Sequence, residues 1–202
     1  MPKTIVAIVG SYRKGGVIDT VVDEILRAAQ DSGVQTTKIY LIDKRIEFCT
    51  NCRACAQNPG KVRGNCRHKD DLVEILDQVD FADGLILASP INFYNVTAVT
   101  RRFMERLIVY GYWPWGSGAP KFRIAKSNKK AVLVTSSAAP AFIGRFFFRS
   151  ALGALKATAQ CFGAEIIAKL YFGMVAQQPD AALNQKEIKR AYNAGIKLAK
   201  RL

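Results

Sequence analysis

The chain has 202 residues, of which 50% are hydrophobic and 23% are charged, a composition typical of a soluble globular protein and not of a disordered one. No apolar run reaches the length of about 18 residues that a membrane-spanning helix needs. Thirty Lys and Arg residues against sixteen Asp and Glu residues give a formal net charge of +14. Such a charge attracts the phosphates of nucleic acids, anionic membranes or phosphorylated cofactors, but it names none of them.

The N-terminal apolar run ends at Gly10 and is too short for a signal peptide. A cytoplasmic protein is therefore expected. The length suits a single domain over residues 1–202.

Strands and helices are predicted to alternate along the chain. Lys3–Gly10 is an almost continuous run of β-branched and apolar residues, the pattern of a strand buried on both faces. Asp19 can cap a following helix, whose apolar residues recur at helical spacing until Gly33. The other predicted strands are Thr36–Ile42, Ala82–Ser89, Lys130–Ser136 and Ala164–Phe172. The other predicted helices are Asp70–Val79, Thr97–Val109, Phe146–Phe162 and Gln185–Leu202.

Five strands that alternate with five helices predict an α/β fold with a doubly wound parallel sheet. Parallel neighbours need crossover connections, which are right-handed and place helices on both faces of the sheet. Five strands suit the flavodoxin-like order 2-1-3-4-5. Two insertions interrupt the alternation, at residues 44–69 and 111–128, and the first holds most of the cysteines.

The first candidate site is the loop after the first strand, because ligands bind at the carboxyl ends of the strands in such a sheet. This loop runs from Gly10 directly into a helix start, where backbone N–H groups and the helix dipole favour a phosphate. The side chains of Ser11, Arg13 and Lys14 would add hydrogen-bond donors. The loop contains neither GxxxxGK[ST] nor GxGxxG, which disfavours a Walker loop and a dinucleotide-binding turn.

The loops after the third and fourth strands complete this edge of the sheet. Phe93 and Tyr94 lie beside the amides of Asn92 and Asn95, a combination that could hold a flat heteroaromatic ring. The loop after the fourth strand contains small residues, which would let a ligand approach the backbone.

Four of the five cysteines form a second candidate site, Cys49, Cys52, Cys55 and Cys66. In a cytoplasmic protein such a cluster indicates metal binding or redox chemistry. The C-x2-C-x2-C spacing matches that of four-iron, four-sulfur proteins, and a tetrahedral zinc site is an alternative. Turn-forming residues between Cys55 and Cys66 need no metal to be explained, which favours free thiols. Cys161, alone on an apolar helix, is expected to be inert core.

These motifs together resemble the family of NAD(P)H-dependent FMN reductases and iron–sulfur flavoproteins. The resemblance rests on GSYRKGG, CxxCxxC, ADGLILASPINFYNVTA and the following FMER, in that order over about residues 3–140. It implies a flavodoxin-like FMN protein that forms a homodimer or homotetramer. Some members of the family carry a four-iron cluster. The residues it implies at the FMN phosphate are Ser11, Arg13, Gly15, Gly16, Val17 and Ile18. The residues it implies at the flavin ring are Pro90, Ile91, Asn92, Phe93, Asn95, Thr135, Ser136 and Ser137.

The leading functional hypothesis is an FMN-dependent oxidoreductase that passes electrons from NAD(P)H to a quinone, a flavin or another small-molecule acceptor. The alternative is an electron-transfer iron–sulfur flavoprotein without an NAD(P)H site. A basic nucleic-acid-binding protein is a remote third, because no known DNA or RNA module is present. No acid or base is assigned, and the single histidine, His68, is expected at the surface.

The apolar, aromatic segment Tyr110–Trp115 is costly to expose as one patch. It is therefore predicted to pack in a subunit interface. The alternative is that it folds over its own subunit.

Overall fold

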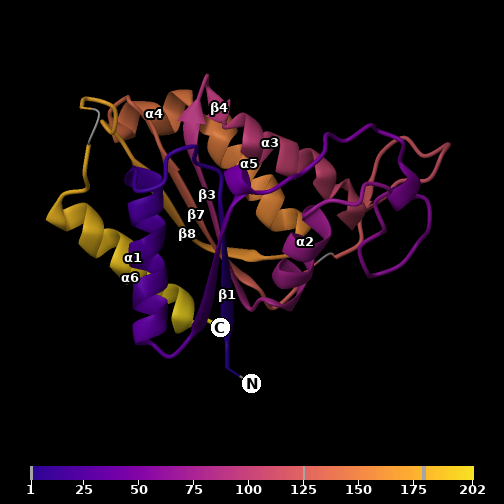
Figure 1. Cartoon of the computed structure of the whole chain (residues 1–202), viewed down its shortest axis with the longest axis horizontal. Helices are drawn as coiled ribbons and strands as arrows, with labels where there is room; N and C mark the ends of the chain where they lie inside the picture. Colours follow the sequence, from indigo (N-terminus) through magenta and orange to yellow (C-terminus); the bar gives the residue numbers. More distant parts are fainter. Residues whose placement is uncertain (1, 125, 179–180) are drawn as a thin grey trace.

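The computed structural model describes residues 2–124, 126–178 and 181–202, so that residue 125 of the second predicted insertion lies outside the described residues. The central sheet has the strand order β2-β1-β3-β7-β8, and every neighbouring pair is parallel (Figure 1). Counted along the chain, this is the predicted order 2-1-3-4-5. The strands are β1 (Thr4–Val9), β2 (Gln35–Tyr40), β3 (Gly84–Asn92), β7 (Lys130–Ser136) and β8 (Glu165–Phe172).

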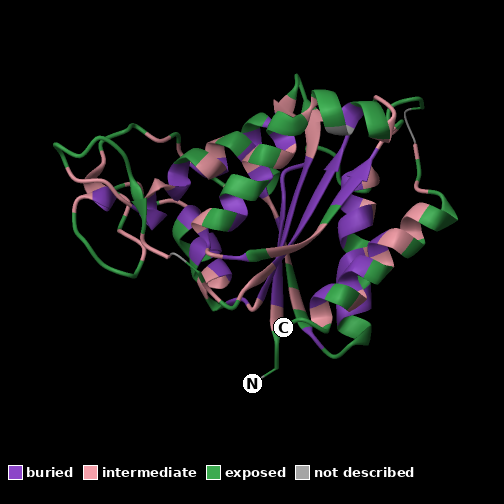
Figure 2. Cartoon of the chain, turned by 180° about the vertical axis from the view of Figure 1, so that it is seen from behind, coloured by how far each residue is buried: buried purple, intermediate pink, exposed green. Residues whose placement is uncertain are grey.

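Helices cover both faces of the sheet (Figure 1). The helices on one face are α1 (Val17–Asp31) and α6 (Gln185–Ala199), and those on the other are α2 (Leu72–Phe81), α3 (Ala98–Glu105) and α5 (Arg149–Cys161). The buried apolar side chains form two clusters, one on each side of the sheet, and the central strands are buried along most of their length (Figure 2). No helix among the described residues has the length and apolar character needed to cross a membrane.

The predicted start of the first helix is wrong by three residues. α1 begins at Val17, and its N-cap is Gly16 rather than Asp19. The Asp19 carboxylate instead accepts a hydrogen bond from the Gly15 N–H at 2.6 Å. Asp19 therefore closes the preceding loop from inside the first turn of the helix.

Two predicted helices change character along their length. The predicted helix Thr97–Val109 is α-helical only as α3 and continues as a tighter 3₁₀ turn. The predicted helix Phe146–Phe162 is divided into α4 (Ala141–Phe147) and α5 at Phe148, whose φ of −106° and ψ of 37° are not helical. The ring of Phe148 contacts that of Tyr94, with centroids 5.3 Å apart. Helical periodicity cannot reveal such a tertiary contact.

The two predicted insertions pack against each other as an insertion lobe, which comprises residues 44–69, 111–124 and 126–128. The lobe projects to one side of the sheet, next to α2 and α3 (Figure 1). The Trp113 N–H donates to the carbonyl oxygen of Ala56 at 2.8 Å, and the Arg123 guanidinium donates to the carbonyl oxygens of Cys55 at 3.1 Å and Gly60 at 3.3 Å. The remaining short elements are β4 (Asn95–Val96), β5 (Gly111–Tyr112), β6 (Lys121–Phe122), η1 (Leu41–Asp43), η2 (Ala54–Ala56) and η3 (Arg106–Tyr110).

The prediction that Tyr110–Trp115 packs in a subunit interface is wrong for the start of this segment, where Tyr110 and Gly111 are buried within their own chain. Tyr110 is 1% exposed, and its hydroxyl donates to the Asp80 carboxylate at 2.7 Å. Burial and this hydrogen bond raise the pKa of Tyr110 above its ordinary value. Trp113 is half-buried, and Trp115 is the large side chain of the segment that stays mostly exposed. The segment therefore folds over its own chain.

Candidate functional site

The loops that follow β1, β3 and β7 meet at the carboxyl edge of the sheet around a pocket of about 290 Å³, here named the edge pocket. The pocket is lined by Ser11, Tyr12, Arg13, Gly16, Val17, Ile18, Pro90, Ile91, Asn92, Ser136, Ser137, Ala138, Val175, Ala176 and Ala181. The structure thus brings together most of the predicted cofactor residues from three loops. Gly15, Phe93, Asn95 and Thr135 are the predicted residues that do not line it.

The first loop presents the N-terminus of α1 to this pocket. Gly16 is the N-cap, and no side chain caps the first turn, so its backbone N–H groups face the pocket without a competing carboxylate or hydroxyl. The N–H of Gly15 is different, because it is already bonded to Asp19. Ser11 is buried, and its hydroxyl accepts from the Arg13 N–H and donates to the Arg13 carbonyl oxygen, both at 3.1 Å. Ser11 therefore shapes the loop as well as lining the pocket.

The sequence suggests that the Lys14 side chain contacts the phosphate, but the structure places this side chain elsewhere. Its Nζ lies 2.7 Å from the Asp43 carboxylate and 4.9 Å from the centroid of the Tyr40 ring. The hydrogen bond with Asp43 raises the pKa of Lys14. Because Lys14 does not line the edge pocket, Arg13 is the cation of this loop that does.

A buried ion pair supports the loop from behind. Burial alone would raise the pKa of Asp19, but its bonds with Lys38, Gly15 N–H and Tyr40 outweigh burial and hold that pKa below its ordinary value. The Asp19 side chain is 5% exposed and is paired with Lys38. The pair neutralises a carboxylate that would otherwise oppose an anion at the helix N-terminus.

The loop after β3 turns away from the pocket at its tip. Phe93 and Tyr94 have φ angles of 44° and 68°, as both central residues of a type I′ hairpin do. This turn joins β3 to β4 and leaves Phe93 97% exposed. Phe93 therefore lies on the rim of the edge pocket, outside its lining, while Asn95 uses its side-chain oxygen to accept the Val96 N–H at 2.8 Å.

The end of β7 forms a rigid wall of the pocket. Ser136 and Ser137 are buried, and the Tyr171 hydroxyl donates to Ser137 Oγ at 2.8 Å. The Ser137 hydroxyl in turn donates to the Ala139 carbonyl oxygen at 3.1 Å. Thr135 lies below them, fully buried, and its hydroxyl has no hydrogen-bond partner within the described residues. Because successive side chains of a strand point to opposite faces of the sheet, the side chain of Thr135 points away from the pocket, to the face that Leu133 shares.

The four predicted cysteines line a second cavity, of about 310 Å³, here named the cysteine cavity. Its lining is Cys49, Thr50, Asn51, Cys52, Arg53, Cys55, Cys66, His68, Glu105, Arg106, Ile108 and Trp113. His68 is therefore half-buried in a cavity wall and not a plain surface residue. Across the described ranges, no three Cys, His, Asp or Glu side chains gather closely enough to hold a metal ion as they stand.

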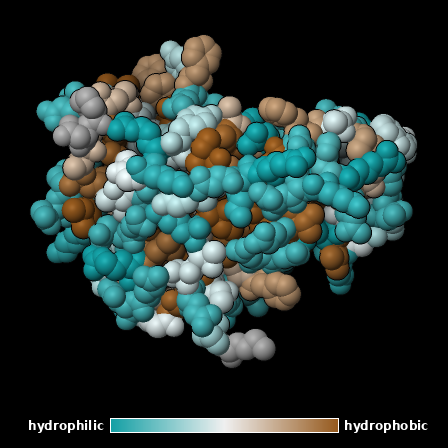
Figure 3. All heavy atoms as spheres, viewed as in Figure 1, coloured by the Kyte–Doolittle hydropathy of each residue, from teal (hydrophilic) through white to brown (hydrophobic). Residues whose placement is uncertain are grey.

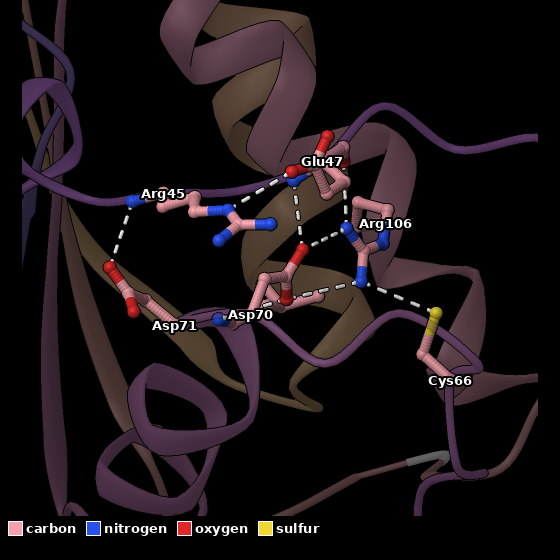
Figure 4. A network of polar contacts seen from close by, with 7 residues as sticks. Arg45, Glu47, Cys66, Asp70, Asp71 and Arg106 are labelled. Atoms are coloured by element: carbon pink, nitrogen blue, oxygen red, sulfur yellow. Dashed lines mark hydrogen bonds and ion pairs between the residues drawn. The ribbon is translucent and has the colours of Figure 1, made fainter.

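The thiols of this cavity differ in their surroundings. The N–H of Ala54 lowers the pKa of the exposed Cys52 thiol, whereas burial raises the pKa of Cys55 to about 11. Burial likewise raises the pKa of Cys161 to about 11, as expected for an inert core thiol. The Cys66 sulfur accepts a hydrogen bond from the Arg106 guanidinium at 3.3 Å (Figure 4).

Sequence reasoning missed residues of both cavities. Tyr12, Val175, Ala176 and Ala181 complete the edge pocket, but the last three lie beyond β8, where only the fold brings them back to this edge. Arg106 was noted only as part of a motif. Its position directly before the apolar run LIVY is a signal that could have identified a buried, paired arginine.

Comparisons with known proteins agree with this geometry. Residues 3–158 match the sequence model of the family described as NADPH-dependent FMN reductase. The chain belongs to this family. An iron–sulfur flavoprotein of Archaeoglobus fulgidus is 36% identical over 109 residues, which are 54% of this chain and 47% of that protein. An iron–sulfur flavoprotein of Methanocaldococcus jannaschii is 37% identical over 102 residues, 50% of each chain. This member of the FMN reductase family thus spans about half the length of the curated relatives it matches.

Solved structures of similar fold extend the likeness of this family member to almost the whole chain. An FMN-dependent NADH-azoreductase from Bacillus anthracis, in complex with FMN, has a TM-score of 0.69 at 15% identity and covers 98% of this chain and 99% of its own. An NAD(P)H:quinone oxidoreductase from Methanothermobacter marburgensis has a TM-score of 0.67 at 15% identity and covers 98% and 96%. At such identities these structures establish the fold alone.

Proposed function

We propose that this protein binds FMN in the edge pocket and catalyses electron transfer from NAD(P)H to a small acceptor such as a quinone or a flavin. The observation that carries the proposal is the meeting of three loops around one pocket at the N-terminus of α1. FMN supplies the redox chemistry when bound, since its ring accepts a hydride and releases electrons singly or in pairs. The chain's own residues bind and orient the cofactor.

The phosphate of FMN is assigned to the first loop. The N–H groups at the start of α1 and the positive end of the helix dipole provide a site for a dianion. The Arg13 side chain, which lines the same part of the pocket, adds a charge-assisted donor.

The flavin ring is assigned to the other two loops. Pro90, Ile91 and Asn92 line one part of the pocket, and Ser136 and Ser137, on the neighbouring strand, line the part beside it. Both parts are fixed by the sheet, because β3 and β7 pair in parallel up to Pro90 and Ser136. A flat ring would lie against these backbone segments.

Anaerobic mixing of the FMN-loaded protein with NADPH, and separately with NADH, tests this activity. The visible absorption of the bound flavin is expected to bleach with at least one of them and to return when a quinone is added. Bleaching by dithionite but by neither nicotinamide would instead favour the second candidate function, an electron-transfer iron–sulfur flavoprotein without an NAD(P)H site. The cysteine cavity is the observation that favours that second candidate.

An iron–sulfur cluster in the cysteine cavity is a further part of the proposal. Four thiols line one cavity, together with the guanidinium groups of Arg53 and Arg106, whose positive charges would offset a negatively charged cluster. The relatives from A. fulgidus and M. jannaschii bear the name iron–sulfur flavoprotein. Thiolates on a cluster bind different iron atoms, so they stand farther apart than ligands of a single zinc ion.

Iron and acid-labile sulfide, measured on protein purified without oxygen, test the cluster. We expect about four of each per chain, and we expect both to be lost from a Cys52→Ser variant that still binds FMN. Zinc at about one per chain, or four free thiols without metal, would contradict this assignment. Neither result would bear on the assignment of FMN to the edge pocket.

The edge pocket is also proposed to be completed by a second copy of this chain. Five exposed aromatic side chains form an aromatic rim around it: Phe93, Tyr94, Phe142, Phe146 and Phe147, which are 63–97% exposed. The β3–β4 turn and the start of α5 are joined by a hydrogen bond from Ser150 Oγ to the Tyr94 carbonyl oxygen at 2.5 Å. Apolar side chains gather over this end of the molecule (Figure 3).

The size of the aromatic rim argues for a second copy as its occupant. Each aromatic side chain can bury about 150–250 Å², so the five offer several hundred Å². A standard interface buries about 800 Å² on each partner, and monomers rarely expose so large an apolar patch. A symmetric dimer would bury the rim of both copies at once.

Light scattering at micromolar concentration is expected to give the mass of a dimer or tetramer. A Phe146→Asp/Phe147→Asp double variant should give the monomer mass with unchanged circular dichroism, because two charges cannot be buried unpaired in the interface. Phe81→Asp is the control, since Phe81 is 87% exposed at the other end of the sheet. A monomeric wild type, or a double variant that stays oligomeric, would reject the aromatic rim as the interface.

A further inference from the structure

Arg106 occupies an unusual place between the sheet and the insertion lobe. It is the largest fully buried side chain of the described residues, at 1% exposure. Its guanidinium donates to both carboxylate oxygens of Asp70, at 2.6 and 3.3 Å, and to the Glu47 carbonyl oxygen at 2.7 Å (Figure 4). The remaining contact is with Cys66 Sγ at 3.3 Å. One buried cation therefore joins a carboxylate, a backbone carbonyl and a thiol.

Its neighbours close the base of the cysteine-bearing insertion. The Glu47 N–H donates to the Asp70 carboxylate, and the Arg45 N–H donates to the Asp71 carboxylate, both at 2.8 Å. The Asp71 N–H donates to the Arg45 carbonyl oxygen at 3.1 Å. The two ends of the insertion are thus fastened to each other (Figure 4). Arg106 lies between these two ends, and its hydrogen bonds with Asp70 and Glu47 fix its position.

Cys66 needs such a fixed partner more than the other three cysteines do. Two residues separate Cys49 from Cys52 and Cys52 from Cys55, whereas ten residues separate Cys55 from Cys66. Most of the intervening residues are exposed, from Asn58 to Val62. The backbone before Cys66 is anchored at Gly64, whose N–H donates to the Val109 carbonyl oxygen at 2.8 Å. The thiol itself still has several rotamers, and the contact with Arg106 selects one of them, at the wall of the cysteine cavity.

We propose that Arg106 is a positioning residue that holds Cys66 in the cysteine cavity as the fourth metal ligand. The inference rests on the proposed metal-binding role of that cavity. Two physical effects would follow from it. A preplaced ligand lowers the entropy lost when a metal centre assembles. A cationic N–H donor at a ligand sulfur also raises the reduction potential of an iron–sulfur centre.

Cobalt(II) is the probe, because it binds metal-free protein reversibly and its thiolate charge-transfer absorption grows with the number of bound thiolates. The thiols stand apart, as a cluster requires, so they must draw together around one cobalt ion, and we expect wild type then to show the intensity of four thiolates. Arg106→Lys keeps a cation beside Asp70 but loses the planar fork that reaches Asp70 and Cys66 together. It should therefore bind cobalt at least tenfold more weakly, with the intensity of three thiolates. Arg27→Lys is the control, an exposed arginine of α1 on the other face of the sheet, and should match wild type.

A double-mutant cycle separates positioning from a general structural role. Cys66→Ser alone should give the three-thiolate spectrum, and adding Arg106→Lys to it should cause no further loss of cobalt affinity. FMN content reports on the fold of each variant. A measurement on wild type needs no variant to fold: cobalt binding should strongly broaden the guanidinium NMR signal of Arg106 and leave that of Arg27, on the other face of the sheet, unchanged.

The outcomes of the two proposals are distinct. Absence of iron from wild type purified without oxygen would defeat the proposed cluster, while the cobalt measurements would still decide the role of Arg106. Four-thiolate cobalt binding at wild-type affinity in Arg106→Lys would overturn the role of Arg106, as would losses that add in the double variant. An Arg106 signal that cobalt leaves unchanged would overturn it too.

Discussion

Replacing Arg13 by Ala is expected to weaken FMN binding by about one to two decades. Arg13 lines the edge pocket next to the N-terminus of α1, where it can donate to the phosphate. A charge-assisted hydrogen bond is worth about 1.5–3 kcal/mol, which corresponds to roughly that loss of affinity. Fluorescence titration of flavin-stripped protein with FMN measures the dissociation constant.

Lys14→Ala is the matched control for this variant. Lys14 is the next residue and carries the same charge, but it pairs with Asp43 and does not line the pocket. We expect its removal to change FMN affinity by less than about threefold, through the weakened long-range field alone. Equal losses in both variants would show that the loop attracts FMN by net charge, without a specific contact from Arg13.

Replacing Asp70 by Asn is expected to cost about 3–5 kcal/mol of unfolding free energy, because it leaves the buried Arg106 charge without its partner. Both side chains of this pair are almost fully buried, at 1% and 0% exposure. The substitution keeps the size of the side chain, so the loss reports charge and hydrogen bonding and not a cavity. Urea denaturation monitored by circular dichroism measures it.

The same pair predicts how stability depends on pH. Burial alone would raise the pKa of Asp70, but hydrogen bonds from Arg106 and the Glu47 N–H outweigh burial and hold that pKa below its ordinary value of about 3.9. A carboxyl whose folded pKa is lowered stabilises the fold above its unfolded pKa, and this contribution is lost as the pH falls through the folded pKa. The stability difference between wild type and Asp70→Asn should therefore be constant near neutral pH and shrink below about pH 4.

Asp71→Asn is the control for both measurements. Its carboxylate accepts one backbone N–H, from Arg45, and it is half-buried. We expect it to cost about 1 kcal/mol. If Asp70→Asn costs as little unfolding free energy as Asp71→Asn, the buried pair does not stabilise the fold to the extent expected. The same holds if the stability difference between wild type and Asp70→Asn does not change with pH.

The sheet and its order could be predicted because their signals are local and strong. Lys130–Ser136 is predicted to the residue, and the ends of the other strands differ by at most three residues. Continuous apolar runs identify strands that are buried on both faces, and a parallel sheet leaves few ways to connect them. The edge pocket followed from this order, since a doubly wound sheet places the first and third strand loops side by side.

Other features depended on contacts that lie far apart in the sequence. Lys14 pairs with Asp43, which follows the second strand, and nothing local shows that Arg13 rather than Lys14 faces the pocket. The positive φ angles of Phe93 and Tyr94 turn Phe93 outward, although Asn-Gly or Asp-Gly is the usual signal for such a turn. The site at Arg106 needs three separate segments to meet. Only the assembled fold reveals that meeting.

The most direct test of the central claim is a titration of flavin-stripped wild-type protein with FMN and, separately, with riboflavin. If the edge pocket holds FMN through its phosphate at the start of α1, FMN should bind at one per chain and at least tenfold more tightly than riboflavin, which lacks the phosphate. The visible spectrum of bound FMN should also differ from that of FMN in water. Failure to bind FMN, or equal affinity for FMN and riboflavin, would contradict the assignment of the edge pocket.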